Sequence, residues 1–191
     1  MNSYIKILFF SLIITVISFI LELNKPFIKK MQKPNFFMII LCRYLHFFLF
    51  LYFSSFMYFF NPKNNRDVLI YLFSALGMFY SWHLLDCCIL TYYELRLYGM
   101  NHNRHYTTFH PTMYSVFNKY SNIVMTIIGI LLLINVGFIM YKNNSFPFYA
   151  KAIYSIVFLF LFIESVLKSR TGKKQEYPTD EEHILNKYLS M

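Results

Sequence analysis

The sequence predicts an all-α protein, a polytopic membrane bundle of about five transmembrane helices, and two observations support this class. The 191 residues are 57% hydrophobic and 21% aromatic but only 14% charged, which is too apolar for a soluble domain of this length. Apolar stretches of membrane-spanning length also recur along the chain, separated by polar and basic connections. These runs are unbroken, which favours helices over the alternating strands of a membrane barrel.

Five segments reach the length of a spanning helix, roughly 17 to 25 residues. They cover residues 5–23, 36–60, 68–93, 123–141 and 146–167. Lys151 falls inside the fifth span, where its long side chain can reach the membrane surface. We therefore expect residues 1–168 to form a transmembrane bundle. Residues 169–191 would form a basic tail, in which Thr179 and Glu182 begin a short amphipathic helix.

The distribution of basic residues predicts the orientation of the bundle. Twelve Lys and Arg residues follow the first, third and fifth spans, whereas five lie on the opposite side. Because cytosolic segments carry the excess of positive charge, the amino terminus is expected outside or in a lumen and the carboxyl terminus in the cytosol. The first span resembles a signal peptide in its basic start, but cleavage would translocate the lysines beyond it, so we expect a retained anchor.

Asp86 is the most conspicuous residue of the third span, because a carboxylate inside an apolar helix needs a partner. Counting helical rise places Asp86 and Arg43 at similar depths, about 10 Å from the cytosolic side. The same count places His46 and His83 level with each other, and Cys87 lies one turn from His83. We therefore predict a buried polar cluster between the second and third spans. Its members are Arg43, His46, His83, Asp86 and Cys87.

Further polar residues lie near the expected cytosolic side. Glu94 and Glu164 would extend the cluster toward the surface. The loop after the third span carries His102, His105 and His110, which we interpret as part of an aromatic interfacial segment; a ligand or metal site is the alternative. The chain has no phosphate-binding glycine loop, Gly-x-Ser-x-Gly sequence or His-Glu-x-x-His sequence, so we predict no catalytic residue and no bound metal.

Two resemblances add to this interpretation. The run from Cys88 to Glu94 resembles the Cys-Pro-Leu-Thr-x-x-Glu signature of a family of small bacterial membrane proteins of unknown function, with Ile89 in place of the proline. The composition and the segment from Trp82 to Glu94 are similar to uncharacterised membrane proteins of giant nucleocytoplasmic DNA viruses. The second resemblance implies a viral membrane.

The leading functional hypothesis is a structural or scaffold role in a viral or organellar membrane, with the polar cluster serving helix packing and no cofactor. Endomembranes or a viral envelope or inner membrane are favoured locations, with the mitochondrial inner membrane as an alternative. The expected partners are membrane lipids, with anionic headgroups at the basic tail, and other subunits in a homo- or hetero-oligomer, but not nucleic acid. The alternative function is a haem or metal redox protein, or a proton or ion conductor, built on His46, His83 and Asp86.

Overall fold

The computed structural model of the chain describes residues 3–22, 33–85, 87–97, 111–117 and 120–171, and in these ranges all regular secondary structure is helical. The helices are α1 (Ser3–Glu22), α3 (Lys33–Phe59), α4 (Asn65–Leu85), α5 (Ile89–Leu97), α6 (Pro111–Phe117), α7 (Ser121–Lys142) and α8 (Phe148–Thr171). The predicted all-α fold is therefore confirmed.

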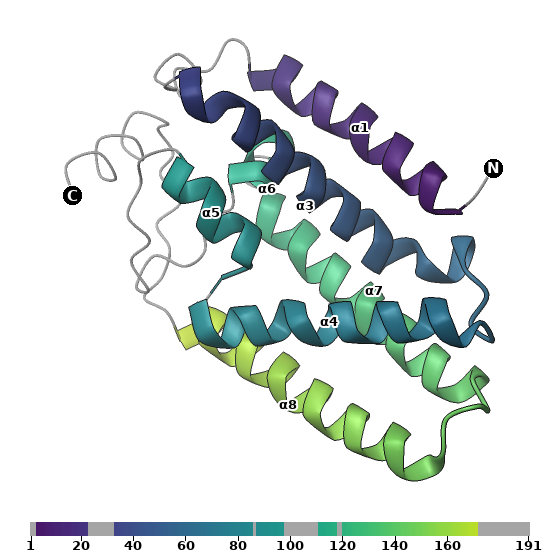
Figure 1. The fold of residues 1–191 in the computed structure, drawn as a ribbon. Helices are drawn as coiled ribbons and strands as arrows, with labels where there is room; N and C mark the ends of the chain where they lie inside the picture. The colour runs from purple at the N-terminus through teal and green to yellow at the C-terminus, as the bar shows by residue number, and fades with distance from the viewer. Residues whose placement is uncertain (1–2, 23–32, 86, 98–110, 118–119, 172–191) are drawn as a thin grey trace.

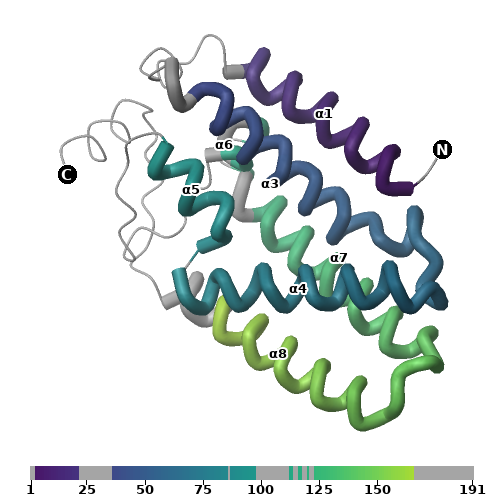
Figure 2. Tube along the Cα trace, in the orientation of Figure 1, coloured from purple at the N-terminus to yellow at the C-terminus, as the bar shows by residue number. Residues whose placement is uncertain are grey.

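The long helices run up and down and form a bundle (Figure 1). Helix α1 packs along α3, and α7 packs behind α3. Helix α8 packs against α4. The start of α1, the α3–α4 connection and the α7–α8 connection meet at one end of the bundle, and the short helices α5 and α6 lie toward the other (Figure 2). We call the first end the turn end and the second the short-helix end.

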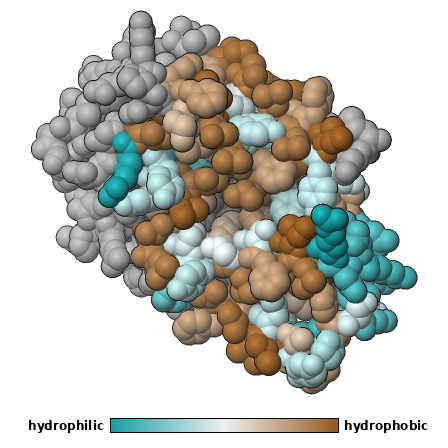
Figure 3. All heavy atoms as spheres, in the orientation of Figure 1, coloured by the Kyte–Doolittle hydropathy of each residue, from teal (hydrophilic) through white to brown (hydrophobic). Residues whose placement is uncertain are grey.

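Five helices are long and apolar enough to cross a membrane, as the sequence predicted: α1, α3, α4, α7 and α8. Their surfaces remain largely hydrophobic, and in Figure 3 the hydrophobic side chains spread over the face of the bundle. In the fifth candidate span, residues 148–165, only 11% of the residues are buried inside the bundle. Such extensive apolar exposure is what a bilayer would cover.

The structure differs from the prediction at the third span. The expected helix over 68–93 begins at Asn65 and ends at Leu85, and a separate helix, α5, begins at Ile89. Cys88 precedes α5, and its carbonyl accepts a hydrogen bond from the Tyr92 amide at 3.0 Å. No Gly or Pro lies at this break in the sequence. A prediction based on apolar length alone therefore gave one helix where the structure has two. The predicted tail helix lies outside the described residues.

An aromatic core joins α3 to its neighbours in the half of the bundle near the turn end. Tyr52, Phe53 and Phe56 of α3 are buried against Tyr71 of α4, whose ring centroid lies 4.3 Å from that of Phe56. The Tyr71 hydroxyl donates a hydrogen bond to the Phe53 carbonyl at 3.0 Å, and Asn135 Nδ2 of α7 donates to the same oxygen at 2.7 Å. One carbonyl of α3 thus links three helices.

The two connections at the turn end are also tied together. Asn143 is 1% exposed, and its Nδ2 donates hydrogen bonds to the Pro62 carbonyl and to Asn65 Oδ1, both at 3.1 Å. Its own Oδ1 accepts from the Ser145 amide at 2.9 Å, which shapes the turn into α8. Asn143 therefore fixes where α8 starts relative to α4.

Candidate functional site

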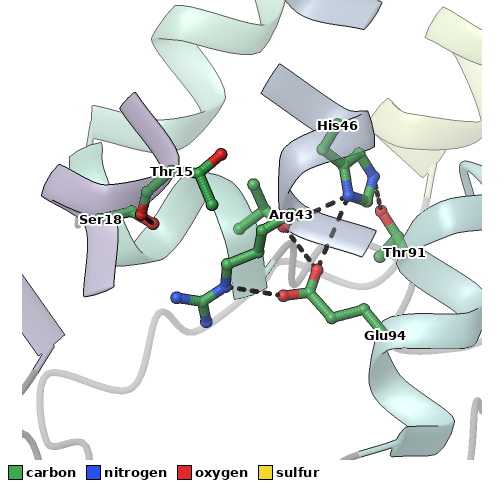
Figure 4. A network of polar contacts seen from close by, with 7 residues as sticks. Thr15, Ser18, Arg43, His46, Thr91 and Glu94 are labelled. Atoms are coloured by element: carbon green, nitrogen blue, oxygen red, sulfur yellow. Dashed lines mark hydrogen bonds and ion pairs between the residues drawn. The ribbon is translucent and has the colours of Figure 1, made fainter. Parts of the chain in front are cut away.

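Five deeply buried polar side chains of the described chain gather where α3, α5 and α6 meet. They form what we call the buried network: Arg43 and His46 of α3, Thr91 and Glu94 of α5, and Thr112 of α6. Figure 4 shows the Glu94 carboxylate between the Arg43 guanidinium and the His46 ring. Each of the five residues is at most 2% exposed, so contacts within the protein must replace water.

Arg43 and Glu94 form the ion pair at the centre of the network. Arg43 Nε lies 3.1 Å from Glu94 Oε1, and both side chains are 0% exposed. The guanidinium also lies over the ring of Phe19 in α1, with Cζ 4.6 Å from the ring centroid. Because a buried charge without a partner is very costly, each member of this pair requires the other.

The second carboxylate oxygen connects Glu94 to α6. Thr112 Oγ1 donates to Glu94 Oε2 at 2.6 Å and lies 3.3 Å from His46 Nδ1, while Thr91 Oγ1 lies 3.2 Å from His46 Nε2. A threonine hydroxyl has one proton, so if Thr112 gives it to Glu94, its oxygen accepts from His46 Nδ1–H. If the imidazole is neutral, its Nε2 then accepts from the Thr91 hydroxyl.

These assignments determine what the network can do chemically. Arg43 and Glu94 cancel in charge, and with a neutral His46 the network carries no net charge, which suits a low-dielectric interior. Both ring nitrogens of His46 have hydroxyl partners, so the imidazole offers no lone pair to a metal without giving up Thr91. Within the described ranges, no group of three or more His, Cys, Asp or Glu side chains is arranged to hold a metal ion.

Helix α1 packs beside the network with small polar residues. Ser11, Thr15 and Ser18 are buried, and each hydroxyl donates to a carbonyl of α1 itself, at 2.7 Å. Thr15 and Ser18 lie on the α1 segment that passes beside Arg43 (Figure 4). Since these hydroxyls are satisfied locally, their small size lets α1 pack closely against α3 and α6.

His83 and Glu164 form a second pair, between α4 and α8. His83 Nδ1 lies 2.7 Å from Glu164 Oε2, and the side chains are 37% and 25% exposed. The structure thus gives His83 a partner on α8, whereas His46 has its partners on α5 and α6. The level pair of histidines expected between the second and third spans is replaced by two separate contacts.

The predicted cluster is therefore only partly what the structure brings together. Arg43 and His46 belong to the buried network, and Cys87 is buried at 3% exposure beside the break before α5. Asp86 and the loop residues His102, His105 and His110 lie outside the described residues, so the Arg43–Asp86 pair stays a prediction. Glu94, expected near the surface, is instead the carboxylate that the structure pairs with Arg43.

Sequence reasoning missed Thr112 and gave Thr91 no role of its own. The available signal was the spacing of Thr91 and Glu94, which lie three residues apart and so share a face of α5. Ile89, where the resembling bacterial signature has proline, is the first residue of α5, a position that proline favours. Nothing in the sequence connects Thr112 to these residues, because its contacts depend on how α6 folds back.

The fold and the site define a helical bundle with five helices able to cross a membrane and a polar network inside it. No family model matches the chain, and comparisons with curated proteins and with solved structures give no match.

Proposed function

We propose that this chain is a multi-pass membrane protein with a structural, scaffold-type role, in which the buried network fastens the short helices to the spanning bundle. The observation that carries the proposal is the Arg43–Glu94 pair, with Nε and Oε1 3.1 Å apart and both side chains fully buried. Glu94 belongs to α5, and Thr112, its other partner, belongs to α6. The network therefore joins both short helices to α3.

The geometry supports this role better than redox or ion-conducting chemistry. A haem or metal site on His46 would need a free ring nitrogen, and both nitrogens contact threonine hydroxyls. Proton passage through Glu94 would neutralise the carboxylate and leave the buried Arg43 guanidinium without a compensating charge. The short helices held in this way form a fixed surface at one end of the bundle, where the basic tail would lie against anionic lipid on the cytosolic side.

Cysteine labelling can test whether the network holds α5. Cys88 lies directly before α5, is 7% exposed, and has a thiol pKa that burial raises above its usual value, so its thiolate should be scarce and slow to react. In vesicles containing the full chain, maleimide labelling of Cys88, read by peptide mass spectrometry, should accelerate at least about tenfold in Arg43→Met and Glu94→Gln. The cause would be local opening of α5.

Glu164→Gln is the matched control, because it removes a carboxylate from the half-exposed pair with His83 and leaves the network intact. Cys88 should then react at the wild-type rate, and gel filtration should give the same single peak. If Cys88 labelling is unchanged in Arg43→Met and Glu94→Gln while both remain folded, the network does not hold α5 and the proposal fails.

A further inference from the structure

An apolar groove lies between α4 and α8 near the turn end of the bundle, at the opposite end from the buried network (Figure 2). Its volume is about 120 Å³. It is lined by Leu69, Leu72 and Phe73 of α4, Met140 of α7, Phe146, and Ala150, Lys151 and Tyr154 of α8. Lys151 is the one charged residue among these lining side chains. The groove thus combines apolar walls with a single cation.

The walls of this groove are fixed by hydrogen bonds rather than left to adjust. The Tyr154 hydroxyl donates to the Leu72 carbonyl at 2.9 Å, which sets the distance between α8 and α4. Asn143 holds the α7–α8 connection against Pro62 and Asn65, as described above. Because an apolar void forfeits packing contacts, apolar groups of a neighbouring molecule would fill an open groove of this kind in a bilayer.

The volume and the charge together indicate what that occupant is. The groove volume of about 120 Å³ is close to that of apolar cavities that hold one small hydrocarbon, so the groove has room for a few methylene groups of a chain. In the described segments at this end, the basic residues are Lys6, Lys63, Arg66, Lys142 and Lys151, against one acid, Asp67. These five basic residues outnumber the one acid, so the net charge of the described segments at this end is positive.

We infer that this groove is a binding site for an anionic phospholipid, with part of an acyl chain against α4 and α8 and the acidic headgroup at Lys151. A lysine about one turn inside a spanning helix reaches toward the headgroup level, which is where a lipid phosphate lies. A neutral lipid would fill the same walls but gain nothing from Lys151. The inference rests on the proposed membrane insertion, and it does not depend on the scaffold role.

The test reconstitutes the purified full chain in vesicles of phosphatidylcholine and phosphatidylglycerol in equal parts, followed by native mass spectrometry of the lipids that remain bound. Phosphatidylglycerol should be retained in preference to phosphatidylcholine. Lys151→Gln should lower that preference about fivefold, the factor expected for one basic residue near a membrane surface. Ala150→Phe, which fills the groove with a ring, should reduce retention of the lipid while leaving Lys151 in place.

Lys142→Gln is the matched control. It removes the same charge at the same end, but Lys142 lies over the rings of Tyr141 and Phe138 and does not line the groove. Retention in Lys142→Gln should therefore equal that of the wild type. Equal retention of both lipids by the wild type would overturn the inference, as would an equal loss in Lys142→Gln and Lys151→Gln. If Ala150→Phe does not fold, Lys151→Gln and its control still decide.

This experiment and the labelling of Cys88 report on opposite ends of the bundle. If the wild type shows no lipid preference but Cys88 labelling still responds as expected, only the lipid-site inference fails. Fast Cys88 labelling only in network variants, whatever the lipid result, would leave the scaffold role standing.

Discussion

A double-mutant cycle on Arg43 and Glu94 tests the energetic basis of the buried network. The changes are Arg43→Met, Glu94→Met and both together, so that an apolar side chain of similar length replaces each charge. Since Nε and Oε1 lie 3.1 Å apart with no solvent exposure, each single variant leaves a buried charge without its partner. We expect each single change to lower the free energy of unfolding by about 3 kcal/mol.

The double variant has no such charge. It loses the Thr112 contact to Glu94 Oε2, which is worth about 1 kcal/mol in a membrane interior, and gains two packed apolar side chains. We therefore expect the double change to cost no more than about 2 kcal/mol, which makes the coupling energy at least about 4 kcal/mol.

Unfolding of the detergent-solubilised chain by sodium dodecyl sulfate, followed by circular dichroism, gives these free energies. A matched cycle on the partly exposed His83 and Glu164 pair should give a coupling energy below about 1 kcal/mol, because its side chains are 37% and 25% exposed rather than fully buried. Additive single effects at Arg43 and Glu94, within about 0.5 kcal/mol, would refute the reasoning.

Two further predictions concern contacts outside the network. Tyr71→Phe and Asn135→Leu each remove one of the two side-chain donors to the Phe53 carbonyl, so each should cost only about 1 kcal/mol in the same assay. The double variant should cost more than the sum of the two, because neither α4 nor α7 then donates to that oxygen. Additive costs would contradict this. Glu164→Gln alone should cost less than about 1 kcal/mol, since both members of its pair are partly exposed, and a loss near that of Glu94→Met would show that the second pair is as critical as the first.

Hydropathy predicted the five spans because membrane-length apolar helices need no tertiary information to be recognised. The ends of α1, α3, α7 and α8 differ from the expected ends by up to four residues. The break between Leu85 and Ile89 was not predictable in the same way, because neither Gly nor Pro lies between these two residues. Packing of α5 against α3 and α6 defines that break, and packing is not a property of the local sequence.

The sequence predicted a buried polar cluster around Arg43, but it did not identify all the residues that form it. An arginine inside a spanning helix requires an acidic partner, so Arg43 marked the right place. The structure supplies Glu94 as that partner, since α5 is a separate helix that directs this side chain inward, whereas a continuous helix would carry it to the surface. Depth counting assumed one straight helix, and it therefore placed Glu94 too far out. The Arg43–Asp86 pair stays a prediction, because Asp86 lies outside the described residues.

The most direct test of the central claim is the topology of the chain in sealed microsomes. Tags are placed at both termini, the membranes are washed with alkaline carbonate, and a protease is added from the cytosolic side. Because five spans place the termini on opposite sides, the chain should stay in the membrane, with the carboxyl tag digested and the amino tag protected. Release by carbonate, or equal digestion of both tags, would contradict the five-span account.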